Sequence, residues 1–564
     1  MKRIGLLYLI IIFLAAVLRL YQLGKTPIAL EWDEVALGYD AYSILRTGRD
    51  QFGKFLPLTF RSLDDYKPPI YEYITVPSVV FFGLNSLSVR LPSAVFGILS
   101  VILSLKLAFL IFSKIFPSGK SSVYISLLSS FLLAVSPWHL QFSRAAFEMN
   151  VSVFITIAAV TTFLLGLKKY KFFLLSAFLF GLDLFSYHST RVVAPLLLAT
   201  LLILFNKQLP AKRYTYLFVI IYGIFVLAFI PILTSQNAQI RFKATNIFNP
   251  GTRYLEDKDL EKIFLEKRIQ DKNAGFELAG KIFHNQRLIY TDYDTIRKAL
   301  NNYLSNFGFE FLFIRGDVPL HHAPGFGLQY IWELPFLILG LIYIFRYGLN
   351  RYTVVILVWL LIAPVPDAIT REAPHAVRTE LMLPIFQLLV ALGIYVCIRF
   401  LVKESVWVRR LFISVIITIF IINISFYLHQ YYVHTNYELS KNWMYGRKEA
   451  VEFTEKIKDG YDRVFVSLRV DMPYIFWLFY TKYPPEKYLS EGGTISGGFA
   501  DERNNFDKYE FRLFDYNSIP NDQKILLVGR PDTIPSDFSG DFNIIKTIYY
   551  LNGDPALQIA EKRR

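Results

Sequence analysis

Two adjacent acids stand in the segment from Ala29 to Tyr73, which directly follows the first long apolar run of the chain. Asp33 and Glu34 would point about 100° apart on a helix, so they cannot both act on one atom. One could remove a proton from an acceptor hydroxyl while the other braces an arginine or a lysine. An acidic first turn that complements the helix dipole is the alternative. Charges at the edge of a membrane are costly unless they are used, which favours catalysis.

Asp40 and Lys67 add to this chemistry within the same segment. Asp40 would share a helical face with Asp33, as a second candidate base or as an acid that orients a ligand. Two prolines follow Lys67, and they stop a helix and fix the lysine in place. A point cation there suits a phosphate leaving group, although a lysine that reaches from apolar surface to water is the alternative. Two neighbouring acids could pair with it or face water, namely Asp64 and Asp65.

Four more candidates for substrate binding lie in short loops between apolar runs. Arg144 and Glu148 have an i, i+4 spacing, which is typical of a helix-stabilising pair but also suits an arginine held for phosphate binding. His188 and Arg191 stand just before another apolar run. Here the arginine could bind an anion or simply anchor the helix at the membrane interface.

The turn that contains Arg371, His375 and Arg378 is a more specific cluster. The two arginines share one face if the turn is helical, and with the histidine between them they could clamp an oxyanion. A metal site from a nearby acid and two histidines is also conceivable, from Asp317, His321 and His322. Adjacent histidines point apart, however, and no H-x-x-x-H spacing supports that site. We therefore assign no metal ligands from the sequence, although the clustered acids would allow a divalent metal.

These clusters belong to a strongly apolar chain. Its 564 residues are 54% hydrophobic and its mean hydropathy is +0.36, which predicts a mainly α-helical, multi-pass membrane protein. Eleven apolar runs, several of them short, are candidate transmembrane helices: Ile4 to Leu23, Leu87 to Phe112, Val123 to Trp138, Val151 to Leu167, Phe172 to Tyr187, Val192 to Phe205, Tyr216 to Leu233, Leu328 to Phe345, Thr353 to Val365, Leu381 to Phe400 and Leu411 to Tyr427. The stretch Ile70 to Gly83 is apolar but short and contains an acid, so we expect an interfacial or re-entrant helix there.

The lysines and arginines predict the orientation in the plasma membrane. With the N-terminus in the cytoplasm, every short inner loop is basic, as in Lys168 to Lys171 and Arg399 to Arg410. All of the polar clusters then fall on the outer side. The same pattern explains much of the net charge of +14 by topology and by contact with membrane lipids, so nucleic acid is excluded as a partner.

Two domains are expected. Residues 1–428 form the transmembrane domain, with outer loops at 24–86 and 234–327, and the second loop is expected to cover the site. Residues 429–564 form an extracytoplasmic α/β domain. Its expected helices lie near Arg447 to Lys458 and Met472 to Lys482, and its strands near Arg463 to Ser467, Lys524 to Gly529 and Asn543 to Tyr550.

Several motifs together resemble the GT-C superfamily of membrane glycosyltransferases, in the family 39-like branch. They are the run Trp32 to Tyr42, Gly48-Arg49-Asp50, Tyr66-Lys67-Pro68-Pro69, the run Val89 to Ser93, and Ser143-Arg144 with Glu148. That branch holds the protein O-mannosyltransferases and the lipid A aminoarabinose transferases. The resemblance covers the N-terminal third specifically, reaches Arg378 less securely and does not include the tail.

The resemblance implies transfer of a sugar from a polyprenyl-phosphate donor to an acceptor hydroxyl, with inversion at the anomeric carbon. It implies that Asp33 is the catalytic base with Glu34 beside it, and that Lys67 and Arg144 lie near the donor phosphate. The other candidates for donor or substrate binding are Tyr39, Asp40, Glu148, His188, Arg191, Arg371, His375 and Arg378. Some superfamily members, notably oligosaccharyltransferases, use a divalent metal. This branch resembles the metal-independent members or leaves the question open.

The acceptor and two rival functions stay open. The tail does not resemble the β-trefoil insert of eukaryotic O-mannosyltransferases, so protein, lipid and glycan acceptors are all compatible with the sequence, and the oligomeric state is not indicated. A transporter or flippase would place charges inside the spans, where the clearest candidate is Asp183. A non-catalytic protein of polymer assembly would instead act through its tail.

Overall fold

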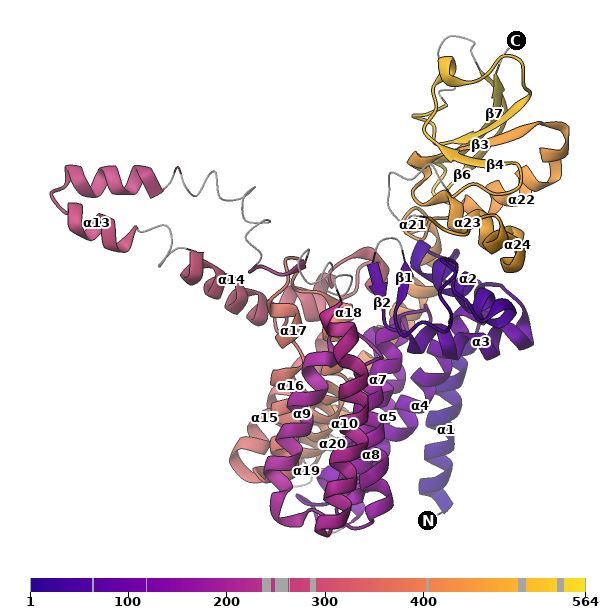
Figure 1. The fold of residues 1–564 in the computed structure, drawn as a ribbon. Helices are drawn as coiled ribbons and strands as arrows, with labels where there is room; N and C mark the ends of the chain where they lie inside the picture. The colour runs from indigo at the N-terminus through magenta and orange to yellow at the C-terminus, as the bar shows by residue number, and fades with distance from the viewer. Residues whose placement is uncertain are drawn as a thin grey trace.

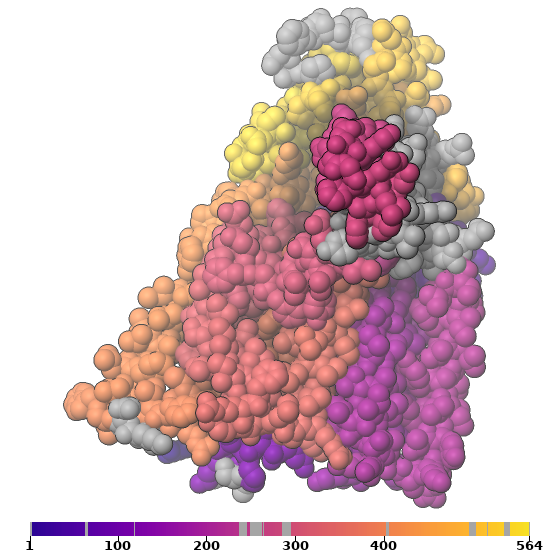
Figure 2. Space-filling view, turned by 90° about the vertical axis from the view of Figure 1, so that its left-hand side faces the viewer, coloured from indigo at the N-terminus to yellow at the C-terminus, as the bar shows by residue number. Residues whose placement is uncertain are grey.

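A computed structural model describes residues 2–62, 65–117, 119–235, 245–248, 262, 264–284, 291–401, 405–495, 504–534 and 542–562. Asp64, the side chain of Asp65 and part of the loop predicted at 234–327 lie outside these residues. Long helices form a bundle, and a sheet domain stands at one end of it (Figure 1). The segment around α13 (Glu277–Phe283) projects away from the bundle, toward the viewer in Figure 2.

A helix occupies each of the eleven predicted apolar runs: α1 (Lys2–Leu20), α4 (Ser86–Phe112), α5 (Lys120–Val135), α7 (Glu148–Gly166), α8 (Tyr170–Asp183), α9 (Thr190–Phe205), α10 (Lys212–Thr234), α15 (Leu334–Tyr343), α16 (Arg351–Ile362), α19 (Ile385–Leu401) and α20 (Val406–His429). In the described part of the chain, 8 helices are long and apolar enough to cross a membrane. A ninth span is bent by 48° where α19 follows the segment Ala376–Met382. With 16 and 14 residues, α5 and α8 are shorter. The predicted polytopic α-helical fold is confirmed.

Small residues let the central helices approach closely. Of the apolar window of α7, 83% is buried, compared with 6% for the span that contains α20. A Cβ added to Gly393 of α19 would lie 1.9 Å from the backbone oxygen of Phe336 in α15. A Cβ added to Gly340 of α15 would lie 2.1 Å from that of Leu389. The two helices therefore touch backbone to backbone, as membrane helices with small interface residues do.

The basic loops meet at the end of the bundle where the N-terminus lies, away from the sheet domain (Figure 1). The rings of Tyr170 and Tyr214, next to two of these loops, stack with their centroids 4.1 Å apart. Lys114 lies 5.3 Å above the ring of Tyr352 from a third loop. These basic loops therefore share one end of the bundle.

A small floor of secondary structure covers the other end of the bundle. It consists of α2 (Trp32–Thr47), the antiparallel strands β1 (Phe60–Ser62) and β2 (Asp65–Lys67), and α3 (Ile70–Phe82). Glu31 caps α2 in a capping box, because its side chain accepts from Glu34 N while the side chain of Glu34 accepts from Glu31 N. The short apolar stretch predicted to be interfacial is thus a separate helix, α3.

The tail forms a five-stranded sheet in the order β4-β3-β5-β7-β6. Its elements are α22 (Arg447–Ile457), β3 (Arg463–Ser467), α23 (Pro473–Thr481), β4 (Tyr509–Arg512), β5 (Ile525–Gly529), β6 (Phe542–Tyr549) and β7 (Pro555–Lys562). β3 runs parallel to β4 and β5, whereas β7 is antiparallel to β5 and β6. The sequence missed β4, which is only four residues long, and β7, which opens with a proline and has little β-branched content.

The sheet domain rests on α2 through α23. Gly38 of α2 allows this contact, because an added Cβ would lie 2.6 Å from the ring of Phe479. Beside it, the Tyr39 hydroxyl donates to the backbone oxygen of Tyr483 at 3.0 Å. One hydrophobic cluster runs from α2 into the sheet domain and includes Trp477. The middle of α2 is therefore the base on which the domain stands.

Candidate active site

One lysine and two acids meet where the floor joins the bundle. Lys67 Nζ, at the end of β2, lies 2.7 Å from Asp33 Oδ1 in the first turn of α2 and 3.7 Å from Glu148 Oε1 at the start of α7. The lysine and Glu148 are nearly buried, whereas 45% of the Asp33 side chain is exposed. Asp33 is thus the member of the cluster that a substrate can reach.

The neighbouring carboxyl groups keep Lys67 protonated. Burial lowers the pKa of Lys67, but the charges of Asp33, Glu148 and Glu31 outweigh burial and raise it overall. Burial, and then the charge of Asp33, raise the pKa of Glu31 well above its usual value. The cluster therefore holds a lysine that stays cationic, beside several carboxyl groups.

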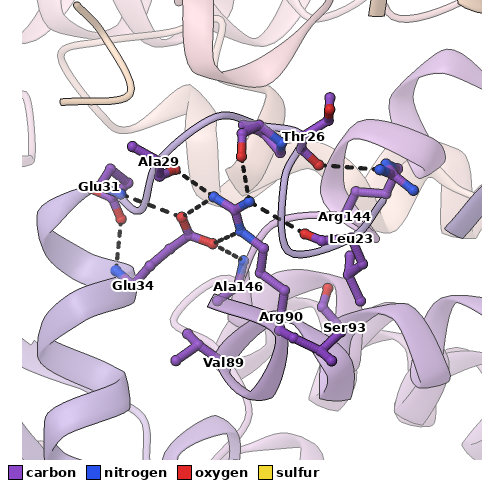
Figure 3. Close-up of polar contacts among 12 residues, drawn as sticks. Leu23, Thr26, Ala29, Glu31, Glu34, Val89, Arg90, Ser93, Arg144 and Ala146 are labelled. Atoms are coloured by element: carbon purple, nitrogen blue, oxygen red, sulfur yellow. Dashed lines mark hydrogen bonds and ion pairs between the residues drawn. The ribbon is translucent and has the colours of Figure 1, made fainter. Parts of the chain in front are cut away.

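Glu34 is engaged with Arg90 of α4 (Figure 3). Arg90 donates from Nε to Glu34 Oε1 and from Nη2 to Oε2, both at 2.8 Å, and the two side chains are buried. The backbone N–H of Ala146 also donates to Glu34 Oε1 at 2.9 Å. The guanidinium further binds three backbone oxygens of the loop after α1, those of Leu23, Pro27 and Ala29. Of the two adjacent acids, Glu34 is thus the one that braces an arginine.

Arg144 binds the end of α1 and the loop that follows it. It donates to the backbone oxygens of Leu18, Arg19 and Thr26, and its Nε donates to the Tyr431 hydroxyl. It lies in the turn before α7, not on one helix with Glu148, so the expectation of an i, i+4 helical pair is wrong. The carboxylate of Glu148 pairs with Lys67 instead.

Tyr39 and Asp40 are buried on α2. Tyr39 contacts the sheet domain, as described above. Asp40 accepts from the backbone N–H of Gln51 at 2.9 Å and from its amide nitrogen at 3.1 Å. Burial, and then the charge of Asp50, raise the pKa of Asp40 well above its usual value. Asp40 thus fastens the loop after α2 and lies away from solvent.

A second polar cluster adjoins the first through an aromatic contact. The His321 ring lies 5.6 Å from the ring of Phe147, the residue before Glu148. His321 Nδ1 lies 2.7 Å from Asp317 Oδ2, and His375 Nδ1 lies 4.0 Å from the same oxygen. His375 therefore lies beside Asp317 and His321.

Arg371 and Arg378 do not lie on one helix. The turn contains two short helices, α17 (Val365–Ala368) and α18 (Ala376–Thr379), separated by non-helical backbone, so the expectation of a shared helical face is wrong. Arg371 is exposed. Arg378 donates to Thr370 Oγ1 at 2.8 Å and pairs with Asp367 at 3.4 Å and Glu372 at 2.9 Å.

A cavity of about 330 Å³ brings together three of the predicted residues, His188, Arg191 and Arg378. His188 Nδ1 lies 2.7 Å from Arg191 Nη1. The remaining wall is largely apolar and includes Val192, Phe229 and Leu233 of α9 and α10. A cavity whose wall contains both arginines and apolar side chains suits an amphiphilic anion.

Comparison with solved structures identifies the fold. ArnT from Cupriavidus metallidurans in the apo state matches 98% of this chain and 97% of its own, with a TM-score of 0.52 at 11% identity. ArnT bound to undecaprenyl phosphate matches over the same shares, with a TM-score of 0.51 at 10% identity. ArnT is a member of the GT-C superfamily. The chain has the GT-C fold.

An oligosaccharyltransferase from Archaeoglobus fulgidus, tethered with an acceptor peptide, is also similar. The match covers 86% of this chain and 63% of that one, with a TM-score of 0.48 at 12% identity. No protein-family model and no curated protein sequence matches the chain. The GT-C fold that the motifs predict is therefore seen in the structure and not in a sequence match.

Two residues that hold this candidate site together had no role in the sequence analysis. Arg90 lies in the motif Val89 to Ser93, but its partner Glu34 is on another helix, and spacing gives no signal for such a pair. Glu31 caps α2, and a signal existed, because an acid three residues before Glu34 fits a capping box.

Proposed function

We propose that this chain is a membrane glycosyltransferase that moves a sugar from a polyprenyl-phosphate donor to an acceptor hydroxyl on the outer face of the membrane. The observation that carries the proposal is the ion cluster of Lys67, Asp33 and Glu148 at one end of a GT-C fold. A half-exposed carboxylate beside a buried cation is what a transfer with an anionic leaving group requires. The structural likeness to ArnT, which was solved with undecaprenyl phosphate, supports the donor class.

The proposed reaction is an in-line displacement. Asp33 takes the proton of the acceptor hydroxyl, and the oxygen lone pair forms a bond to the anomeric carbon. The bond from that carbon to the phosphate oxygen breaks, and its electrons leave with the polyprenyl phosphate. The configuration at the carbon is inverted.

Lys67 links the two halves of this step. In the described structure it pairs with Asp33 at 2.7 Å. When the ammonium turns toward a phosphate, it stabilises the leaving group and leaves the Asp33 carboxylate open to the acceptor hydroxyl. Donor binding thus prepares the base.

The cavity at His188, Arg191 and Arg378 supports an amphiphilic donor, because its wall combines these side chains with apolar residues of two membrane helices. The transporter alternative gains no support from Asp183. Its two carboxylate oxygens accept from Thr156 Oγ1 at 2.7 Å and Ser186 Oγ at 2.6 Å, which suits a structural acid. Membrane lipids are the only other partner we propose.

The test is transfer from radiolabelled polyprenyl-phosphate sugars by purified protein in lipid nanodiscs, with a protein, a lipid and a glycan acceptor in parallel. We expect Asp33→Asn to lower the rate about 100- to 10,000-fold. Asp459→Asn, at an exposed position in the sheet domain, is the matched control and should keep the wild-type rate. Transfer at the wild-type rate by Asp33→Asn would remove this residue as base, and no transfer from any donor would refute the activity.

A further inference from the structure

We infer that Asp317, His321 and His375 form a binding site for one divalent transition metal ion such as Zn²⁺. One possible ligand atom from each of the three residues lies within 4.8 Å of the others. Two imidazoles and one carboxylate are a ligand set that zinc prefers, and they leave a fourth position open. This inference concerns metal binding by the chain itself and does not depend on the proposed sugar transfer.

The distances suit a metal with little movement. Two ligand atoms of a tetrahedral zinc ion, each about 2.1 Å from the metal, lie about 3.4 Å apart. In the structure, the corresponding distances from Asp317 Oδ2 are 2.7 Å to His321 Nδ1 and 4.0 Å to His375 Nδ1. The distance to His321 must lengthen and the distance to His375 must shorten, each by less than an ångström, because the ideal distance lies between the two.

A second observation at the same place is an unsatisfied carboxylate oxygen. The Asp317 side chain is 7% exposed, and within the described residues its Oδ1 is buried without a hydrogen-bond partner. Such an oxygen costs free energy unless something binds it. Its other oxygen accepts from the backbone N–H of Ala376 at 2.8 Å, which holds the carboxylate in place. A cation between Asp317 and the histidines would compensate the buried charge.

The ligands come from two separate segments that meet beside the Lys67 cluster. Asp317 and His321 belong to the segment before α15, and His375 directly precedes α18. The His321 ring lies 5.5 Å from that of Phe142 and 5.0 Å from that of His375, so its orientation is fixed by packing. A metal would therefore clamp these two segments against the turn that leads to Glu148.

His322 offers a matched control within the same segment. Its Nδ1 bonds with the neighbouring backbone oxygen of Ala323 at 3.0 Å, and its ring lies against Gly316. It is therefore a histidine of the same segment that is not one of the three ligands. A nonspecific affinity for histidine-rich surface would not distinguish it from His321.

The test uses the full chain in nanodiscs, stripped with a chelator and titrated with Zn²⁺ against a chromophoric competitor. We expect one tight site in wild type and in His322→Ala, and an affinity more than about 100-fold weaker in Asp317→Asn and His375→Ala, beyond the loss that an outer-sphere partner causes. His375→Cys should restore binding and give the bound Co²⁺ derivative a new thiolate charge-transfer band. Such a band requires a folded site in which position 375 is a ligand.

Two results would overturn the inference. One is wild-type affinity no greater than that of Asp317→Asn, and the other is an equal loss in His322→Ala. Wild type without a tight site would mean that Asp317, His321 and His375 form a hydrogen-bonded network only. Because binding is measured without any sugar donor, neither result bears on the proposed transfer.

Discussion

Lys67 Nζ contacts Asp33 Oδ1 at 2.7 Å and so joins the end of β2 to the first turn of α2. The contact is asymmetric, since the lysine side chain is 8% exposed and that of the aspartate 45%. The buried cation lies against an accessible acid, and this acid stays open to an acceptor. This relationship determines the first prediction.

Lys67→Met should lower the transfer rate about 100- to 1,000-fold, as the loss of a group that stabilises leaving-group charge does. Lys67→Arg keeps the charge and should retain more of the rate. The measurement is kcat and KM with the donor varied, together with thermal unfolding to show that both variants fold. Equal rates in the methionine variant and wild type would separate Lys67 from the reaction.

Breaking the pair of Glu34 and Arg90 should destabilise the fold. Removing one partner of a buried ion pair leaves an uncompensated charge and costs about 3–5 kcal/mol, so Arg90→Met should unfold at lower denaturant concentration. The double variant Glu34→Gln with Arg90→Met should lose less than the sum of the single losses. Additive losses would mean that the two side chains do not interact in solution.

Asp40 predicts a pH dependence of stability. Its folded pKa is raised by burial and by Asp50 above the unfolded value of about 3.9. The folded state therefore binds this proton more tightly, so stability is greatest below the unfolded pKa and falls as the pH rises toward the folded pKa. Asp40→Asn should flatten this slope when unfolding temperatures are compared from pH 4 to pH 8, and an unchanged slope would contradict the assignment.

Gly38→Ala should loosen the sheet domain. The new Cβ would lie 2.6 Å from Phe479 and from Val89, both buried, and overpacking of this kind costs about 1–3 kcal/mol. Limited proteolysis between α21 (Thr435–Glu438) and α22 is the measurement, and cleavage should be faster than in wild type. Gly83→Ala is an informative comparison, because no atom lies within 4 Å of its added Cβ, although a side chain is disfavoured at its φ of +73°.

The sequence predicted the helices and the segment that carries the site, because apolar runs and an acid-rich loop are local patterns. Residue spacing alone could not predict which acid would stay open, and only the family resemblance selected Asp33. Asp33 and Glu34 have the same chemistry, and only the position of Arg90 on α4 separates them. The i, i+4 spacing of Arg144 and Glu148 was misleading, because the partners of Arg144 are mostly backbone oxygens, which every residue has.

The histidines show the same limit. Spacing within one segment led to His321 and His322 as a possible pair. In the fold, His321 instead meets His375, which follows it in the sequence after two membrane helices. A contact between residues so far apart in the sequence produces no spacing pattern that a single sequence could show.

The seat of the sheet domain on α2 has a mechanical consequence. Asp33 lies in the first turn of this helix, and Gly38 and Tyr39 hold the domain one to two turns further along. A helix of this length moves as a stiff rod, whereas Lys67 is carried by a separate strand. A tilt of the sheet domain would therefore change the distance between Asp33 and Lys67. The position of the sheet domain is in this way coupled to the spacing of the two charges.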